Sequence, residues 1–303
     1  MQKFLRKTLT ACLAVVLAAG SIVPVSGFAQ EDDGSQTYDA LPLASTVVGQ
    51  ADNGGIVRSQ VAYVVDLTDN RILYSKNADV IRPIASISKL MTALIVTTAN
   101  LNMNEQIIIT ADDIDRVKKS SSRLSVGTIL TRSELLHLAL MSSENRAAHA
   151  LGRTYPGGMN AFVREMNAKA RQLGMTRTRF VEPTGLSPQN VASPRDLVRL
   201  MQAVHQQPLI REYTTSDKYE IVTSNGREQR YRNTNRLIRN SNWNIHISKT
   251  GYIREAGDCL VMMTEMDHRP VAVVLLNADG GLTRFADAVR VRHMVQQDYP
   301  TLL

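Results

Sequence analysis

The sequence predicts an α+β domain whose antiparallel sheet is assembled from both ends of the chain. Strand patterns occur soon after residue 60 and again after residue 244, whereas the long stretch between them has apolar residues at helical spacing. The chain has 303 residues, of which 44% are hydrophobic, so one large domain or a core with an inserted subdomain can bury a substantial interior.

The first residues have the layout of a secretory signal peptide. Three basic residues precede an apolar run over residues 9–19, and small residues suit cleavage after Ala29. A membrane-spanning helix is the alternative, but the run is short, and Gly20 and Pro24 interrupt its far end. We therefore expect residues 1–29 to direct export to the periplasm and to be removed.

A linker and a strand pair follow. Residues 30–55 are rich in Asp, Gly, Ser and Gln, which predicts a flexible segment before a domain over residues 56–303. The domain opens with strand patterns at 61–65 and 71–75, separated by an Asp-Asn turn signal.

Helical patterns then dominate until the late strands. Helices are expected over residues 86–99, 133–152 and 159–173, and another begins at Ser193-Pro194. Strands are expected at 245–248, 259–264 and 271–276, followed by a last helix over 282–296. Because the sequence ends soon after that helix, we expect no extra C-terminal β domain.

The chain is moderately basic. Its formal net charge is +7, and removal of the three basic signal residues leaves about +4. Basic residues gather at Arg227, Arg230, Arg232, Arg236 and Arg239. A solvated face is the simpler interpretation, and a surface for an anionic polymer is the other. No pattern typical of a nucleic-acid-binding module is present.

Cysteine and histidine usage argues against a disulfide or a metal site. Cys259 is the one cysteine beyond the signal peptide, so no internal disulfide can form, and its apolar surroundings predict a buried strand residue. The six histidines include no H-x-x-x-H or H-E-x-x-H pair. We expect no metal and no other cofactor.

The S-x-x-K motif Ser86-Ile87-Ser88-Lys89 begins the first predicted helix. Lys89 lies three positions after Ser86 and therefore on the same helix face. A serine hydroxyl needs a base, and a lysine can serve only if its pKa of about 10.4 is lowered, by burial, a helix N-terminus or a second cation such as Lys249. Taken alone, a helix cap and an exposed lysine are simpler interpretations.

Two further polar motifs occur later in the chain. Ser143-Glu144-Asn145 lies within or at the start of a helical stretch, where Ser143 could relay a proton and Asn145 could hold the lysine or a substrate amide. A polar turn between helices is the alternative. Lys249-Thr250-Gly251 ends a strand pattern and could bind an extended peptide as an added strand, or could simply be an edge strand with a surface lysine.

Together, S-x-x-K, S-x-N and K-T-G in this order resemble the penicillin-recognising serine hydrolases. Residues 82–93, RPIASISKLMTA, are similar to the low-molecular-mass penicillin-binding proteins, which are D-alanyl-D-alanine carboxypeptidases and endopeptidases. Four segments look closest to the endopeptidase branch: PTGLSP at 183–188, NTNRL at 233–237, SKTGY at 248–252 and EAG at 255–257. The resemblance covers nearly all of the chain after Gly55.

The resemblance implies a β-lactamase/transpeptidase-like fold, with an antiparallel sheet flanked by helices and a mostly helical subdomain. It implies acylation of Ser86 with Lys89 as the base, and a proton path completed by Ser143 and Asn145. Lys249, Thr250 and Gly251 would bind substrate. The oxyanion hole would use the backbone N–H groups of Ser86 and Tyr252.

The implied protein is a periplasmic DD-endopeptidase that hydrolyses D-alanyl cross-links between peptidoglycan stem peptides and is inhibited by β-lactams. A carboxypeptidase of the same family and a non-catalytic penicillin sensor or wall-binding module are alternatives. A class A β-lactamase would need a glutamate that positions water, and no clear E-x-x-L-N segment occurs. Residues 296–303 are too short for an amphipathic membrane anchor.

Overall fold

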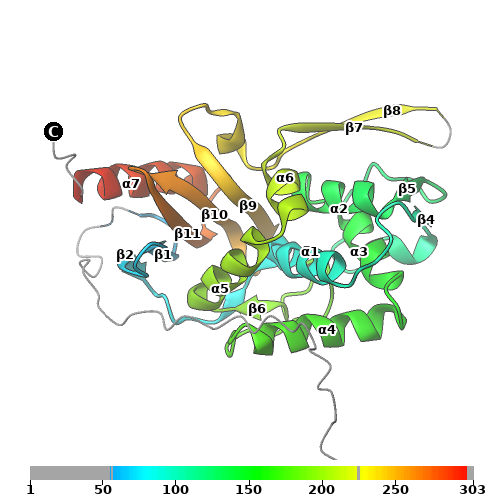
Figure 1. Cartoon of the computed structure of the whole chain (residues 1–303), viewed down its shortest axis with the longest axis horizontal. Coiled ribbons are helices and arrows are strands. Elements are labelled where there is room, and N and C mark those ends of the chain that lie inside the picture. The colour runs from blue at the N-terminus through cyan, green and yellow to red at the C-terminus, as the bar shows by residue number, and fades with distance from the viewer. Residues whose placement is uncertain (1–54, 56, 224–225, 299–303) are drawn as a thin grey trace, which may run out of the picture. The chain divides into compact units, whose positions relative to one another are not determined.

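The computed structural model describes residue 55, residues 57–223 and residues 226–298. The predicted signal peptide and nearly all of the predicted flexible segment lie outside these residues. In the part described, a five-stranded antiparallel sheet has the order β2-β1-β11-β10-β9 (Figure 1). Its strands are β1 (Val61–Asp66), β2 (Ile72–Lys76), β9 (Asn244–Ile253), β10 (Gly257–Met266) and β11 (Arg269–Ala278).

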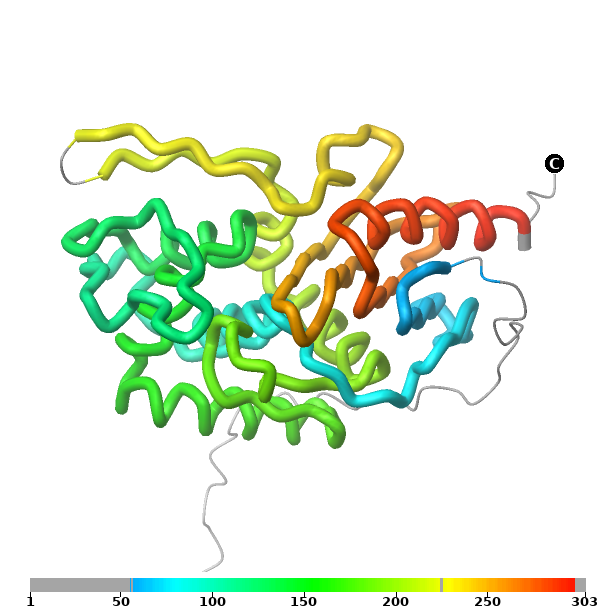
Figure 2. The backbone as a smooth tube through the Cα atoms, turned by 180° about the vertical axis from the view of Figure 1, so that it is seen from behind, coloured from blue at the N-terminus to red at the C-terminus, as the bar shows by residue number. Residues whose placement is uncertain are grey.

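The sheet joins the two ends of the domain, as predicted. Val61 at the start of β1 lies opposite Leu276 of β11. Successive residues of the central strands alternate between two apolar clusters, because neighbouring side chains in a strand point to opposite faces. The C-terminal helix α7 (Thr283–Asp298) covers one face, and the other packs against α5 (Pro194–His205) and the helical part (Figures 1 and 2).

The helical part surrounds the first α-helix. Residues 89–96 of α1 are all buried, so this helix forms the centre of the larger cluster. This helix is α1 (Lys89–Thr98), and its neighbours include α2 (Arg132–Met141), α3 (Asn145–Arg153), α4 (Gly158–Gln172) and α6 (Pro208–Thr215). The predicted start of α5 is confirmed, since Ser193 caps it and Pro194 occupies its first turn. No helix within the described ranges has both the length and the apolar character needed to cross a bilayer.

The predicted single helix over residues 133–152 is wrong. The chain forms α2 and α3 instead, separated by a turn in which Ser143 has a φ of +61°. The hydroxyl of Ser142 donates to the carbonyl of Leu138, and the carboxylate of Glu144 accepts from Arg146 N–H at the start of α3. Such side-chain bonds to the backbone compete with a continuous helix, so Ser143 lies in a polar turn between two helices.

Several short elements were not predicted. They are the pairs β3 (Arg82–Pro83) with β6 (Val191–Ala192), β4 (Gln106–Ile108) with β5 (Ile129–Thr131), and β7 (Lys218–Val222) with β8 (Glu228–Arg232), and the 3-10 turns η1 (Ala85–Ser88), η2 (Ala111–Asp113) and η3 (Arg236–Arg239). The predicted strand at 245–248 is also longer, because β9 continues through K-T-G to Ile253. Cys259 is fully buried in β10 as expected, and burial raises the pKa of its thiol to about 11.

Candidate active site

The three motifs converge beside the edge strand β9. This strand packs against η1, the 3-10 turn that contains Ser86 and leads into α1. A cleft of about 490 Å³ opens there. Six of the predicted site residues line it: Ser86, Ser143, Asn145, Thr250, Gly251 and Tyr252. The lining also includes Lys118, Ser120, Leu186, Thr234, Ile253, Arg254 and Arg284, which had not been singled out as site residues.

Lys89 is the polar centre of the site. Its side chain is 0% exposed, and its Nζ lies 2.9 Å from Ser86 Oγ, 2.8 Å from Asn145 Oδ1 and 2.6 Å from the carbonyl oxygen of Thr184. An ammonium group has three protons to donate, so these acceptors match its capacity. The interpretation of Lys89 as an exposed helical lysine is therefore wrong.

Burial also tunes this lysine. Removal from water lowers the pKa of Lys89 from 10.5 to about 8, although the carboxylates of Glu182, Glu144 and Asp115 partly oppose the change. With this pKa roughly one group in ten is neutral at pH 7 and has a lone pair that can accept a proton. The cause is burial rather than the second cation that the sequence suggested.

Lys249 lies behind the wall of the cleft and is not among its lining residues. It is 1% exposed, and its Nζ donates to the carbonyl of Thr250 at 3.0 Å. Burial lowers its pKa well below the ordinary value, and the charges of Lys89 and Arg284 add to the effect. The charge of Lys89 thus contributes to the lowered pKa of Lys249.

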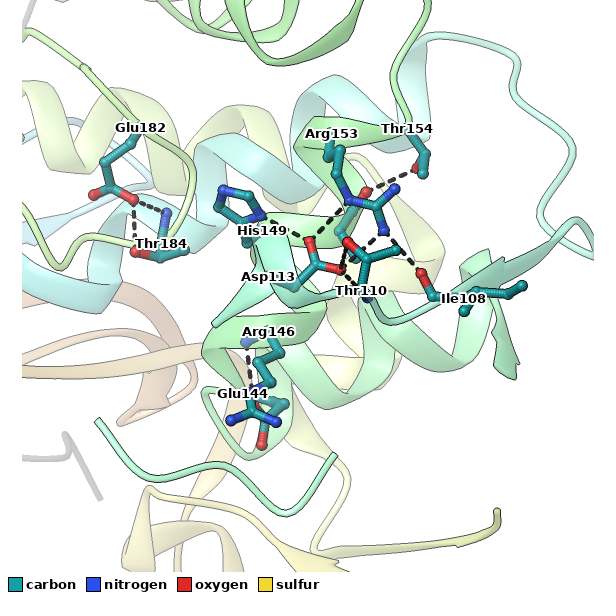
Figure 3. Close-up of polar contacts among 11 residues, drawn as sticks. Ile108, Thr110, Asp113, Glu144, Arg146, His149, Arg153, Thr154, Glu182 and Thr184 are labelled. Atoms are coloured by element: carbon teal, nitrogen blue, oxygen red, sulfur yellow. Dashed lines mark hydrogen bonds and ion pairs between the residues drawn. The ribbon is translucent and has the colours of Figure 1, made fainter. Parts of the chain in front are cut away.

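The third acceptor of Lys89 belongs to a loop held by Glu182. Its carboxylate accepts hydrogen bonds from the backbone N–H and the hydroxyl of Thr184, at 2.6 and 2.5 Å (Figure 3). It also accepts one from Gly185 N–H at 2.7 Å. Asn190, fully buried, ties the same loop to Ser88 in η1. Glu182 therefore fixes the direction in which the carbonyl of Thr184 points.

Two glycines let the backbone approach the turn before Ser86. Ala85 has a φ of +49°, which is unusual for a residue with a side chain. A Cβ on Gly185, whose φ is +82°, would lie 1.9 Å from the carbonyl oxygen of Ala85. A Cβ on Gly251 would lie 3.0 Å from Ser86 N. The loop and the strand thus clamp the turn from two sides.

Gly185→Ala is expected to reduce acylation of the site by about 100-fold, because the clash must displace either the loop or the turn by about 1 Å. The unfolding midpoint should also fall. Gly127→Ala is the matched control, since Gly127 has a similar φ of +88° but open space around a built Cβ. Penicillin-adduct kinetics and thermal unfolding of both variants test this. If both variants lost the same acylation rate and the same unfolding midpoint, backbone strain rather than the contact with Ala85 would explain why position 185 is a glycine.

Asn145 and Ser143 occupy the opposite wall. Asn145 begins α3, and its Nδ2 donates to Ser120 Oγ at 2.8 Å, so its amide links Lys89 to a loop that the sequence did not implicate. Ser143 lines the cleft, and its hydroxyl has no hydrogen-bond partner within the described part of the chain. This hydroxyl is therefore available to a bound molecule.

The loop that carries Ser120 is anchored at its start by a buried carboxylate. Asp113 accepts hydrogen bonds from His149 at 2.8 Å and from Arg153 at 2.9 and 3.0 Å (Figure 3). Burial raises the pKa of Asp113, but the hydrogen bonds from His149 and Arg153 outweigh it and lower the value to about 2. These contacts fix the loop to α3, and hence Ser120 relative to Asn145.

The K-T-G side of the cleft offers a hydroxyl and a cation. Thr250 Oγ1 bonds Thr234 Oγ1 at 2.6 Å, and Arg284 donates to the carbonyl of Gly251 at 2.9 Å while pairing with Asp258 at 2.6 Å. Arg284 comes from the last helix and was missed, because one arginine in a helix carries no sequence signal. Tyr252 is 62% exposed at the rim.

Comparison with known proteins identifies the family. Residues 47–280 match the family described as D-alanyl-D-alanine carboxypeptidase, whose members are serine peptidases. The chain belongs to this family. It is 45% identical over 258 residues to the D-alanyl-D-alanine endopeptidase of Escherichia coli, which covers 85% of this chain and 82% of that protein. It is 47% identical over 243 residues to the D-alanyl-D-alanine endopeptidase of Pseudomonas aeruginosa, covering 80% and 78%.

A solved structure supports the same assignment. The crystal structure of the Streptomyces K15 DD-transpeptidase superimposes with a TM-score of 0.73 at 27% identity, covering 78% of this chain and 97% of that one. The predicted α+β, transpeptidase-like fold is therefore confirmed, and so is the predicted relation to the endopeptidase branch of this family.

Proposed function

We propose that this protein is a periplasmic serine DD-endopeptidase that hydrolyses D-alanyl cross-links between peptidoglycan stem peptides. The single observation that carries the chemistry is the 2.9 Å contact between Lys89 Nζ and Ser86 Oγ in a buried setting that lowers the pKa of the lysine to about 8. The specificity rests on the similarity to the two endopeptidases.

The first half of the reaction forms an ester. Ser86 Oγ attacks the carbonyl carbon of the D-alanyl residue as neutral Lys89 takes the hydroxyl proton. The oxygen that becomes negative is assigned to the backbone N–H groups of Ser86 and Tyr252. The bare backbone at Gly251, where a Cβ would lie 3.0 Å from Ser86 N, supports this assignment because it leaves room beside the donor.

The intermediate then collapses and the leaving amine needs a proton. Charged Lys89 supplies it through Ser143, whose unpaired hydroxyl lines the cleft, while Asn145 keeps the lysine oriented. The carbon–nitrogen bond breaks, and the acyl group remains on Ser86. Water then attacks the ester with the same groups in reverse roles, which releases the shortened stem and restores the serine.

Penicillin should acylate Ser86 by the same first half and leave slowly. No Asp or Glu lines the cleft among the residues that the structure describes, and Glu165 lies exposed on α4. A carboxylate that activates water against the ester, as in class A β-lactamases, is therefore not part of the lining. This supports a penicillin-inhibited peptidase rather than a β-lactamase.

Cross-linked dimers should fall to monomers faster than pentapeptide monomers lose D-alanine. Both bonds use the same acyl-enzyme, so the difference lies in the leaving group, which is a branched peptide in one case and a free amino acid in the other. Purified protein is incubated separately with each substrate, products are identified by mass spectrometry, and Ser86→Ala is the blank. Release of D-alanine while dimers survive would make the protein a carboxypeptidase.

A further inference from the structure

The hairpin of β7 and β8 has one charged face that the proposed reaction does not use. The two strands extend from the body of the domain (Figures 1 and 2). Along each strand, residues alternate between exposed and covered positions. Lys218 lies opposite Arg232 and Glu220 opposite Arg230, and residues opposite each other in an antiparallel pair share one face.

The pair at the base of the hairpin is unfavourable by itself. Lys218 and Arg232 are both exposed and carry like charges, and neither side chain forms a hydrogen bond or ion pair within the described ranges. The next pair along the hairpin carries opposite charges and forms an ion pair, with Arg230 Nε 2.9 Å from Glu220 Oε1. Like charges directly opposite each other destabilise a strand pair, so an anion between Lys218 and Arg232 would relieve a cost that the free protein carries.

A third exposed cation follows the hairpin along the chain. Arg236 in η3 is exposed and without an ion pair in the described part of the chain, and its charge helps to lower the pKa of Arg284, which lines the cleft. Thr234, another lining residue, follows Arg232 by two positions, which is about 7 Å along an extended chain. Because Thr234 Oγ1 lies 2.6 Å from Thr250 Oγ1, the base of the hairpin lies beside the K-T-G end of the cleft.

We propose that Lys218, Arg232 and Arg236 form an anion site that binds a carboxylate of the cross-linked stem peptide outside the cleft. This inference rests on the proposed function and names what the enzyme recognises beyond the scissile bond. A peptide is favoured over an anionic membrane because Glu220 and Glu228 lie on the same hairpin face and would be repelled by a negatively charged surface.

The test compares wild type with a Lys218→Gln/Arg232→Gln/Arg236→Gln variant on cross-linked dimers. On dimers with free carboxylates, KM should rise about tenfold and kcat should stay unchanged. This is the pattern expected on loss of a charge-assisted contact that stabilises the bound substrate and the transition state equally. On the same dimers with amidated carboxylates, wild type and variant should have the same raised KM. Penicillin acylation should be equal in both, because the proposed anion site lies outside the cleft in which Ser86 is acylated.

An Arg164→Gln/Arg171→Gln variant is the matched control, since both arginines are exposed on α4, and its KM should match wild type. The unfolding midpoint of the hairpin variant should equal or exceed that of wild type, because like-charge repulsion is removed. An unchanged KM, or an equal rise on amidated dimers, would overturn the inference, as would binding of wild type but not the variant to phosphatidylglycerol vesicles. If wild type neither forms the penicillin adduct nor cleaves dimers, the proposed function itself fails.

Discussion

Ser86→Ala should abolish the covalent penicillin adduct and lower cross-link hydrolysis by roughly 10⁴-fold or more, since loss of a serine nucleophile in other peptidases costs up to about 10⁶. The reason is specific to this position. Within the described residues, Ser86 is the serine whose hydroxyl lies against the buried Lys89, at 2.9 Å. The fold should persist, because that hydroxyl takes part in a single hydrogen bond, the one from Lys89.

Intact mass after incubation with penicillin is the measurement, and peptide mapping locates the adduct. Ser143→Ala is the informative companion, because its hydroxyl also lines the cleft but makes no hydrogen bond with Lys89 among the described residues. That variant should still form the adduct on Ser86, more slowly. An adduct on Ser86→Ala, or one that maps to Ser88 or Ser143 in the wild type, would refute the assignment of the nucleophile.

Lys89→Met should reduce acylation by about 10²- to 10⁴-fold while the chain remains folded, which is the range that a positioned general base contributes. In wild type the acylation rate should rise with pH through a pKa of about 8, because only neutral Lys89 accepts the proton. A rate that is flat across neutral and mildly alkaline pH would contradict a lysine base.

The same variant tests how burial of Lys89 affects stability. The pKa of this lysine is about 8 in the folded protein against an ordinary value of 10.5 when the chain is unfolded, so the unfolded state binds more protons between these values. The cost of burying the charge, about 3 kcal/mol, is fully present below the folded pKa and is relieved as pH rises to the unfolded one. The free energy of unfolding of wild type relative to Lys89→Met should therefore rise across that window. Urea titrations at its two ends measure it, and a constant difference would contradict the lowered pKa.

The sequence predicted the site best where chemistry is carried by side chains at fixed spacing. Ser86 and Lys89, three positions apart, come together as the motif requires, and Thr250 and Tyr252 line the same cleft. The carbonyl of Thr184, 95 positions beyond Lys89, could not be found this way, because a backbone oxygen has no signature in a sequence.

For the fold, too, some elements could be predicted from the sequence and others could not. The strands of the main sheet are buried apolar runs, so hydrophobic pattern alone located β1, β10 and β11. The hairpin β7–β8 was missed because its strands consist mostly of polar or charged residues and bury only alternate positions. The break between α2 and α3 was missed because the apolar spacing continues across it, while short polar contacts around Ser143 decide the local backbone.

The pairing of Val61 with Leu276 has a consequence for when the enzyme becomes active. The two residues are 215 positions apart (276 minus 61). Strands β1 and β11 therefore cannot pair until nearly all of the domain is present. Contacts of such long range are slow to form, because the intervening chain must lose its freedom first. The cleft needs Ser86 from the early part and Gly251 and Arg284 from the late part. An incomplete chain therefore has no assembled cleft, and activity can begin only when the last strands and the last helix are in place.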